Sequence, residues 1–175
     1  MNAPSRPFNV LILCTGNSAR SILAEALFNR IGQGKFQAYS AGSHPTGFVQ
    51  PIALELLESV GMPTEGLRSK NWDEFARPDA PHMDFIITVC DRAHGEVCPH
   101  WPGTPISAHW GFPDPAAASG DEAHQRYAYN EVLHGLSNRI RQFASLPLEA
   151  LDALAIKREM DRIGSEPIDT TERSA

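Results

Sequence analysis

Residues 8–31 constrain the fold of this chain more than any other segment. Residues 8–13 form a mostly apolar run that is typical of a buried strand. After a short loop, apolar side chains return at helical spacing, at Ile22, Leu23, Ala26, Leu27 and Ile31. Residues 37–41 then predict a second strand, which ends at Gly42. A strand, a helix and a strand in this order indicate a βαβ unit and therefore a parallel sheet.

The loop between the first strand and the helix reads Cys14-Thr15-Gly16-Asn17-Ser18-Ala19-Arg20-Ser21. Its small residues allow a tight turn, in which backbone N–H groups without intrahelical partners lie at the positive end of a helix dipole. Such an arrangement binds a tetrahedral oxyanion. The guanidinium of Arg20 adds a planar fork that can hold two oxygens of the anion. We therefore expect residues 14–21 to form an oxyanion site.

Cys14 opens this loop, and Arg20 follows six residues later. The backbone N–H groups, the helix dipole and the guanidinium all favour negative charge on sulfur. We therefore expect a Cys14 thiolate well below the pKa of about 8.5 of a free thiol. The alternative is a buried structural cysteine beside an arginine on a solvated helical turn. The glycine, asparagine and serine between the two residues favour a nucleophile.

The eight loop residues resemble the signature loop of the low-molecular-weight tyrosine phosphatase family, which includes thiol-dependent arsenate reductases. The resemblance covers about residues 8–143. It implies an α/β fold of three layers, a four-stranded parallel sheet with helices on both faces. We assign residues 1–147 to this domain. Residues 148–175 are assigned to a C-terminal helix over residues 148–163 and a polar, disordered tail.

Length and composition limit the class of protein and its partners. The 175 residues suffice for one domain with a real core. The formal net charge of -6 argues against a nucleic-acid binder. No apolar stretch approaches the length of a membrane span, and the first residues lack the apolar core of a signal peptide, so we expect a cytoplasmic protein with no membrane partner. Cysteines in such a reducing compartment serve catalysis, redox chemistry or metal binding more often than structural disulfides.

The other two cysteines frame a short segment that follows a third predicted strand. Residues 84–90 form a nearly continuous apolar run, which is typical of a strand covered on both faces. Cys90 ends this run as Cys14 ends the first, so we expect both sulfurs at one edge of a parallel sheet. Gly95 and the prolines after Cys98 indicate a weakly held segment that can be remodelled.

A rigid aromatic loop follows a last short strand, which is predicted at residues 105–109. It reads His109-Trp110-Gly111-Phe112-Pro113-Asp114-Pro115-Ala116 and resembles the arsenate reductase branch of the family. The resemblance implies that Asp114 is a general acid, whereas an isolated Asp-Pro pair more commonly begins a turn or caps a helix. Residues 116–118 are alanines where the phosphatases place aromatic side chains, which favours an inorganic oxyanion over a phosphotyrosine.

The resemblance further implies a three-cysteine relay that reduces arsenate to arsenite. In that relay Cys14 attacks arsenate with Asp114 as the acid, and Cys90 then attacks the sulfur of Cys14. Cys98 resolves this disulfide as a Cys90–Cys98 pair, which thioredoxin or a similar thiol reductant reduces. No cofactor is implied.

Two other functions remain open from the residues alone. Cys14, Arg20 and Asp114 are sufficient for a phosphatase acting on phosphotyrosine or on small phosphate esters. An oxyanion or redox sensor would instead use Cys90 and Cys98 only to report oxidation.

Two possible metal sites bear on this chemistry. A zinc site would use Cys90, His94, Cys98 and His100, but their spacing fits no common zinc motif. In some related arsenate reductases a potassium ion lies beside the anion loop, with ligands that align with Asn17, Glu25 and Ser40. Lys70 stands where those members carry an aspartate, and its ammonium could replace the ion. We therefore predict no metal requirement.

Two further helices are predicted at residues 49–60 and 121–146. The longer one has an expected inward stripe of apolar side chains, at Tyr127, Val132, Leu133, Leu136, Ile140 and Phe143.

Overall fold

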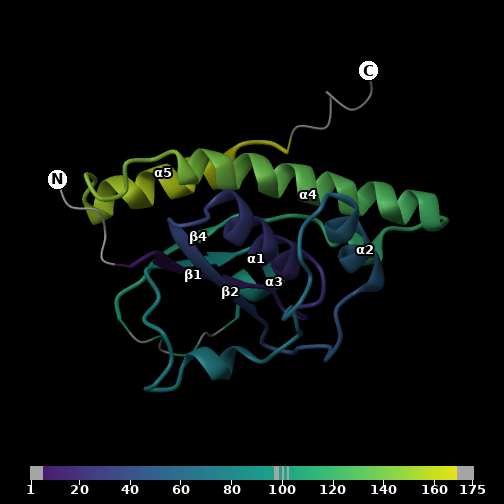
Figure 1. Ribbon diagram of the computed structural model, residues 1–175, viewed down its shortest axis with the longest axis horizontal. Coiled ribbons are helices and arrows are strands. Elements are labelled where there is room, and N and C mark those ends of the chain that lie inside the picture. Colours follow the sequence, from purple (N-terminus) through teal and green to yellow (C-terminus); the bar gives the residue numbers. More distant parts are fainter. Residues whose placement is uncertain (1–5, 97–98, 100, 102, 169–175) are drawn as a thin grey trace.

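A parallel sheet lies at the centre of the computed structural model, which describes residues 6–96, 99, 101 and 103–168 (Figure 1). Its four strands are β1 (Phe8–Leu13), β2 (Phe36–Ala41), β3 (Phe85–Thr88) and β4 (Ile106–His109). They lie in the order β2-β1-β3-β4, and each neighbouring pair is parallel. The α/β fold with a four-stranded parallel sheet is therefore confirmed, and each strand overlaps a strand that the sequence predicts.

Helices cover both faces of this sheet and complete the three layers. The α-helices are α1 (Arg20–Ile31), α2 (Pro51–Ser59), α3 (Asp91–His94), α4 (Glu122–Ala144) and α5 (Ala153–Ser165). Helices α1, α4 and α5 lie on one side of the sheet (Figure 1) and share the main apolar core with it. The 3-10 helix η1 (Trp72–Phe75) buries Trp72 and Phe75 against the opposite face. None of the described helices is both long and apolar enough to span a membrane.

The inward stripe of α4 differs from the prediction at one position. Tyr127 is 53% exposed, whereas Tyr129 is buried with Val132, Leu136 and the rest of the stripe. Five residues separate Tyr127 from Val132, which turns its side chain about 140° away from that face of the helix. Tyr129 is three residues from Val132 and lies on the same face.

The C-terminal helix begins later and ends later than predicted. Asp152 caps α5 by accepting a hydrogen bond from the Ala155 backbone N–H at 2.8 Å, so residues 148–152 precede the helix. The helix continues through Gly164 and Ser165, which the sequence places in the polar tail. Residues 169–175 of that tail lie outside the described part of the chain. Helix α5 packs on β4 and contributes three side chains to the main core: Ile156, Met160 and Ile163.

Gly164 allows α5 to approach the end of β4 very closely. A Cβ atom at this position would lie 2.5 Å from the His109 carbonyl oxygen and 2.6 Å from Cδ1 of Trp110. The same tryptophan donates a hydrogen bond from Nε1 to the Met160 carbonyl at 3.0 Å. Only glycine therefore permits this contact between the helix and the strand.

We expect Gly164→Ala to lower the free energy of unfolding by about 1–3 kcal/mol, because the methyl group overpacks this contact. The sign of the change in the free energy of unfolding is informative, because replacing glycine with alanine inside a helix normally stabilises a protein by up to about 1 kcal/mol. Urea denaturation of wild type and variant measures the difference. Gly95→Ala is the control, because its Cβ would meet no atom closer than 3.8 Å. A Gly164→Ala protein as stable as wild type would contradict this view of the contact.

Candidate active site

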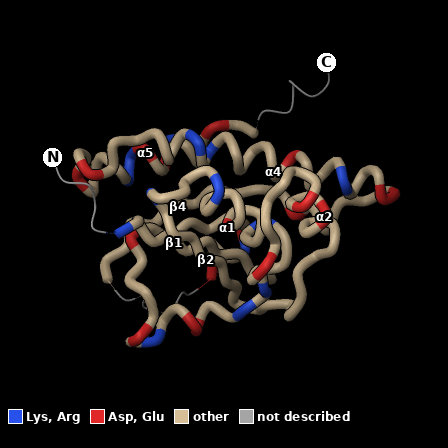
Figure 2. The backbone as a smooth tube through the Cα atoms, viewed as in Figure 1, with Lys and Arg blue, Asp and Glu red and all other residues tan. Residues whose placement is uncertain are grey.

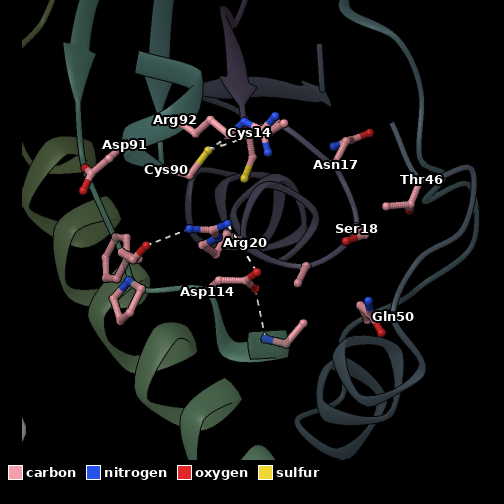
Figure 3. A pocket seen from close by; sticks show the side chains of 16 residues that line it. Cys14, Asn17, Ser18, Arg20, Thr46, Gln50, Cys90, Asp91, Arg92 and Asp114 are labelled. Carbon is pink, nitrogen blue, oxygen red and sulfur yellow. Dashed lines mark hydrogen bonds and ion pairs between the residues drawn. The ribbon is translucent and has the colours of Figure 1, made fainter. Parts of the chain in front are cut away.

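Strands β1 and β3 end side by side and bring Cys14 and Cys90 to the same edge of the sheet. Their pairing sets Leu13 opposite Thr88, and the Val89 N–H donates to the Leu13 carbonyl at 3.0 Å. Cys14 follows β1 directly, and Cys90 lies two residues beyond β3. Both side chains border one cavity of about 560 Å³ (Figure 3). The two sulfurs therefore share one edge, as their places after apolar runs predict.

The cavity collects most of the predicted site residues. Its lining includes the loop from Cys14 to Arg20, together with Cys90 and Asp114. Ser21 does not line it, because this side chain is buried beneath the loop. The lining also includes residues that the sequence analysis does not identify: Thr46, Gln50, Asp91, Arg92, Phe112, Pro113 and Ala116. Asp91 and Arg92 directly follow Cys90, so their place near the site could be inferred from the sequence. Thr46 and Gln50 belong to no recognisable motif, and the sequence gives no sign that they line the cavity.

The loop turns three of its carbonyl groups outward and leaves the N–H groups of residues 16–20 without a partner among the described residues. Three carbonyls accept backbone N–H groups from the segment after β2, at 2.9–3.0 Å: Thr15 from His44, Gly16 from Thr46 and Ser18 from Gln50. Within the described part of the chain, the N–H groups of residues 16–20 have no protein acceptor. Helix α1 starts at Arg20 with no acidic residue in its first turn. These N–H groups and the helix dipole are thus free to bind an oxyanion.

Asn17 holds the loop from within the protein. It is fully buried and adopts the left-handed conformation, with φ 46°. Its side-chain amide donates to Ser21 Oγ at 2.8 Å and to Ser40 Oγ at 3.0 Å, while its oxygen accepts the Lys70 backbone N–H at 2.9 Å. These hydrogen bonds satisfy both the NH₂ group and the oxygen of the Asn17 side chain. They offset the conformational free energy that the left-handed backbone of Asn17 costs.

Lys70 and Glu25 continue this network as a buried ion pair. Lys70 Nζ lies 3.7 Å from Glu25 Oε1 and donates to the Arg68 carbonyl at 2.8 Å. Ser40 Oγ donates to the same carboxylate at 2.5 Å. Burial raises the pKa of Glu25 and lowers the pKa of Lys70, and the opposite charge of the partner counteracts each shift. An ammonium thus lies beside Glu25 and Ser40, near the place where the resemblance implies potassium.

Arg20 connects the anion loop to the loop that carries Asp114. Its Nη1 donates to the Phe112 carbonyl at 2.9 Å, and its Nη2 lies 3.9 Å from Asp114 Oδ2. Asp114 also accepts the Ala116 N–H at 3.0 Å, which caps the 3-10 helix η2 (Pro115–Ala117). The Asp114 side chain is 44% exposed at the mouth of the cavity. Figure 3 shows the guanidinium and this carboxylate next to each other in the site.

Cys14 and Cys90 line the same cavity, and interaction between their thiols shifts the pKa of both. Together with burial, this interaction raises the pKa of Cys14, and the positive charge of Arg20 offsets the rise only in part. The same interaction lowers the pKa of Cys90 to about 5. Cys90 Sγ also accepts the N–H groups of Thr15 at 3.3 Å and of Ala93 at 3.4 Å. These shifts favour the thiolate on Cys90, whereas the sequence predicts it on Cys14, because a second sulfur competes for the proton.

The third cysteine and the zinc site lie partly outside the described residues. Cys98 and His100 are not described, so the placement of the resolving cysteine stays a prediction. His94 stacks on the ring of His109, with 4.3 Å between centroids. Among the residues that the structure places, no three histidine, cysteine or carboxylate side chains gather as metal ligands.

We expect a thiolate with a pKa near 5 in the reduced Cys98→Ser protein, seen as ultraviolet absorbance of the thiolate against pH. Adding Cys14→Ala removes the thiol that interacts with Cys90, so the transition should move to higher pH by about one unit or more. A transition that stays near pH 5 in this double variant would contradict this account, because Cys14 would then not be the cause of the low Cys90 pKa.

The chain resembles proteins of known class in sequence and in structure. A family model described as low molecular weight phosphotyrosine protein phosphatase matches residues 9–159. An arsenate reductase of Halalkalibacterium halodurans is 33% identical over 135 residues, which cover 77% of this chain and 94% of the relative.

Two solved structures share the fold. The arsenate reductase of Archaeoglobus fulgidus superposes with a TM-score of 0.61 at 29% identity, covering 78% of this chain and 99% of that one. A thioredoxin-dependent arsenate reductase of Corynebacterium glutamicum gives a TM-score of 0.56 at 25% identity, and the match covers 79% of this chain and 61% of that one. The matched residues include the anion loop, both described cysteines and Asp114. The chain belongs to the low molecular weight phosphotyrosine protein phosphatase family.

Proposed function

We propose that this protein reduces arsenate to arsenite, with Cys14, Cys90 and Cys98 as successive thiols and thioredoxin or a similar dithiol as the reductant. The observation that carries this proposal is the placement of Cys14 and Cys90 on the lining of one oxyanion cavity, at the ends of two paired strands. A phosphatase needs one nucleophilic sulfur, whereas reduction of As(V) requires a second thiol within reach of the first. The similarity to enzymes named arsenate reductase points to the same substrate.

The first step is attack of Cys14 on arsenic. The loop N–H groups and Arg20 bind the oxygens of arsenate and stabilise the charge that develops on them. The proton of Cys14 passes to the neighbouring thiolate of Cys90, so that the nucleophile itself becomes a thiolate. Asp114 protonates the departing hydroxide, which leaves as water. The product is an As(V) adduct on Cys14 sulfur.

The second step transfers two electrons from sulfur to arsenic. Cys90 releases its proton to solvent and attacks Cys14 Sγ as a thiolate; the S–As bond breaks, its electron pair stays on arsenic, and arsenite leaves. This forms a Cys14–Cys90 disulfide. The N–H groups of Thr15 and Ala93, which donate to Cys90 Sγ at 3.3 and 3.4 Å, support this role because they favour its thiolate.

The third step regenerates the nucleophile. Cys98 attacks Cys90 sulfur, which forms a Cys90–Cys98 disulfide and frees Cys14. A dithiol reductant of the thioredoxin type then reduces this disulfide and becomes oxidised itself. Helix α3 between the two cysteines has only four residues, so little helical structure opposes their approach. The thioredoxin-dependent relative from C. glutamicum is consistent with this choice of reductant.

The second candidate function is hydrolysis of phosphate esters. Cys14, Arg20 and Asp114 would suffice for it, with water attacking a phosphocysteine intermediate. An apolar groove of about 530 Å³ borders Asp114 on the side of α4 and offers space for an organic leaving group. Ala116, however, offers only a methyl group at the cavity wall where an aromatic clamp would stand.

We expect Cys90→Ser to abolish multiple-turnover arsenate reduction, because no second sulfur remains to expel arsenite. Cys98→Ser should allow at most one turnover. The assay follows NADPH oxidation on addition of arsenate, with thioredoxin and its reductase present. The same assay with phosphate in place of arsenate is the blank.

Hydrolysis of an aryl phosphate provides the matched control for these variants. Both serine variants should retain the hydrolysis shown by wild type, whereas Cys14→Ser should lose reduction and hydrolysis together. Undiminished reduction by Cys90→Ser or Cys98→Ser would overturn the relay, and wild-type hydrolysis without any reduction would favour the phosphatase.

A further inference from the structure

Arg139 of α4 is a buried arginine behind the loop that carries Asp114. Only 6% of the residue is exposed. Its Nη1 donates to the Gly111 carbonyl at 3.3 Å, and its Nη2 donates to the Glu166 carbonyl at 2.8 Å. The guanidinium also lies over the Phe112 ring, 4.5 Å from its centroid. One side chain thus joins the segment after α5 to the two residues that precede Pro113 and Asp114.

The same loop is held from the opposite side by the arginine of the anion site. The Phe112 carbonyl accepts Arg20 Nη1 at 2.9 Å, while the Phe112 ring is the surface on which Arg139 stacks. Asp114 lies two residues further along, within 3.9 Å of Arg20 Nη2. The loop from Gly111 to Asp114 is therefore clamped between two guanidinium groups.

The remaining backbone contacts fix the start of this loop more firmly than its end. The N–H groups of Trp110 and Phe112 donate to the Thr88 and Val89 carbonyls, at 2.7 and 3.0 Å. Beyond Phe112, the chain has two prolines around Asp114 and therefore few N–H groups to anchor it. The position of Asp114 consequently depends on how Gly111 and Phe112 are held from behind.

Glu166, whose carbonyl accepts the hydrogen bond from Arg139 Nη2, is itself well anchored. Glu166 follows α5, and its carboxylate accepts hydrogen bonds from Arg162 Nη1 at 2.8 Å and from Gln142 Nε2 at 3.0 Å. Helix α5 is fixed against β4 by the close contact at Gly164. The family model ends at residue 159, so Gly164 and Glu166 lie beyond its matched part.

We propose that Arg139 is a positioning residue for the acid of the reaction: by joining Glu166 to Gly111 and Phe112, it makes the C-terminal segment a structural support of Asp114. This inference rests on the proposed function, in which Asp114 protonates the leaving group. An arginine suits the role because its planar fork reaches two carbonyls while its face covers an aromatic ring. Neither methionine nor lysine can make all three contacts.

The test is a double-mutant cycle with Arg139→Met and Asp114→Asn, measured as kcat/KM for arsenate reduction. Misplacement of a catalytic group by about 1 Å can cost about a hundredfold in rate. We therefore expect Arg139→Met alone to lower kcat/KM by about 10- to 100-fold. In the Asp114→Asn background the same change should cost no more than about twofold, because the group it positions is already absent.

A role in stability alone would produce a different pattern. The loss from Arg139→Met would then be equal in both backgrounds, and this result would overturn the proposal. All assays run below the melting temperature of every variant, measured by circular dichroism. Arg141→Met is the matched control, because Arg141 is an exposed arginine of the same helix, and it should leave kcat/KM unchanged.

The cycle is repeated with an aryl phosphate, whose hydrolysis would use the same acid. A wild-type protein that hydrolyses this substrate but does not reduce arsenate would refute the proposed function and still test Arg139. Additive losses in the activity that wild type possesses would overturn the role of Arg139 alone. A wild-type protein with neither activity would overturn both proposals.

Discussion

The parallel pairing of β1 with β3 is the constraint on which the site depends. Its register sets Leu13 opposite Thr88, so the chain leaves both strands at the same level and delivers Cys14 and Cys90 to one cavity. A shift of this register by one residue would reverse the faces of the strand and separate the sulfurs. Because the core packing of both strands fixes that register, the distance between the sulfurs is a property of the whole sheet.

An acidic chain builds its anion site from a few well-placed groups. The net charge of -6 gives no general attraction for arsenate or phosphate, so binding relies on the loop N–H groups, the start of α1 and Arg20. Asn17 fixes the loop before any ligand arrives, which lowers the cost of ordering it on binding. The positive electrostatic potential that attracts the anion thus comes from groups at the site itself. Figure 2 shows that acidic and basic residues are interspersed along the rest of the chain.

The sequence predicts the order of elements well because β1 and β3 are mostly apolar and turn residues separate the elements, and it predicts the anion loop because this chemistry occupies consecutive residues. It could not predict contacts that join distant segments. The interaction between Cys14 and Cys90, which opposes the expected charge on Cys14, depends on sheet register. Nothing in the sequence distinguishes Arg139 from an exposed helical arginine, because its partners Gly111 and Glu166 lie far away along the chain. The wrong prediction at Tyr127 has a simpler cause. Its apolar ring suggests a core position, but its angle around the helix axis places it outside the buried face of α4.

The central claim is that the sulfur of Cys90 takes the place of arsenic on Cys14. Its most direct measurement uses reduced Cys98→Ser protein, one equivalent of arsenate and no other reductant, with acid quenching and mass spectrometry of the peptides. The account predicts one arsenite released per protein and a disulfide that joins the Cys14 and Cys90 peptides. Arsenite released without that disulfide would contradict it.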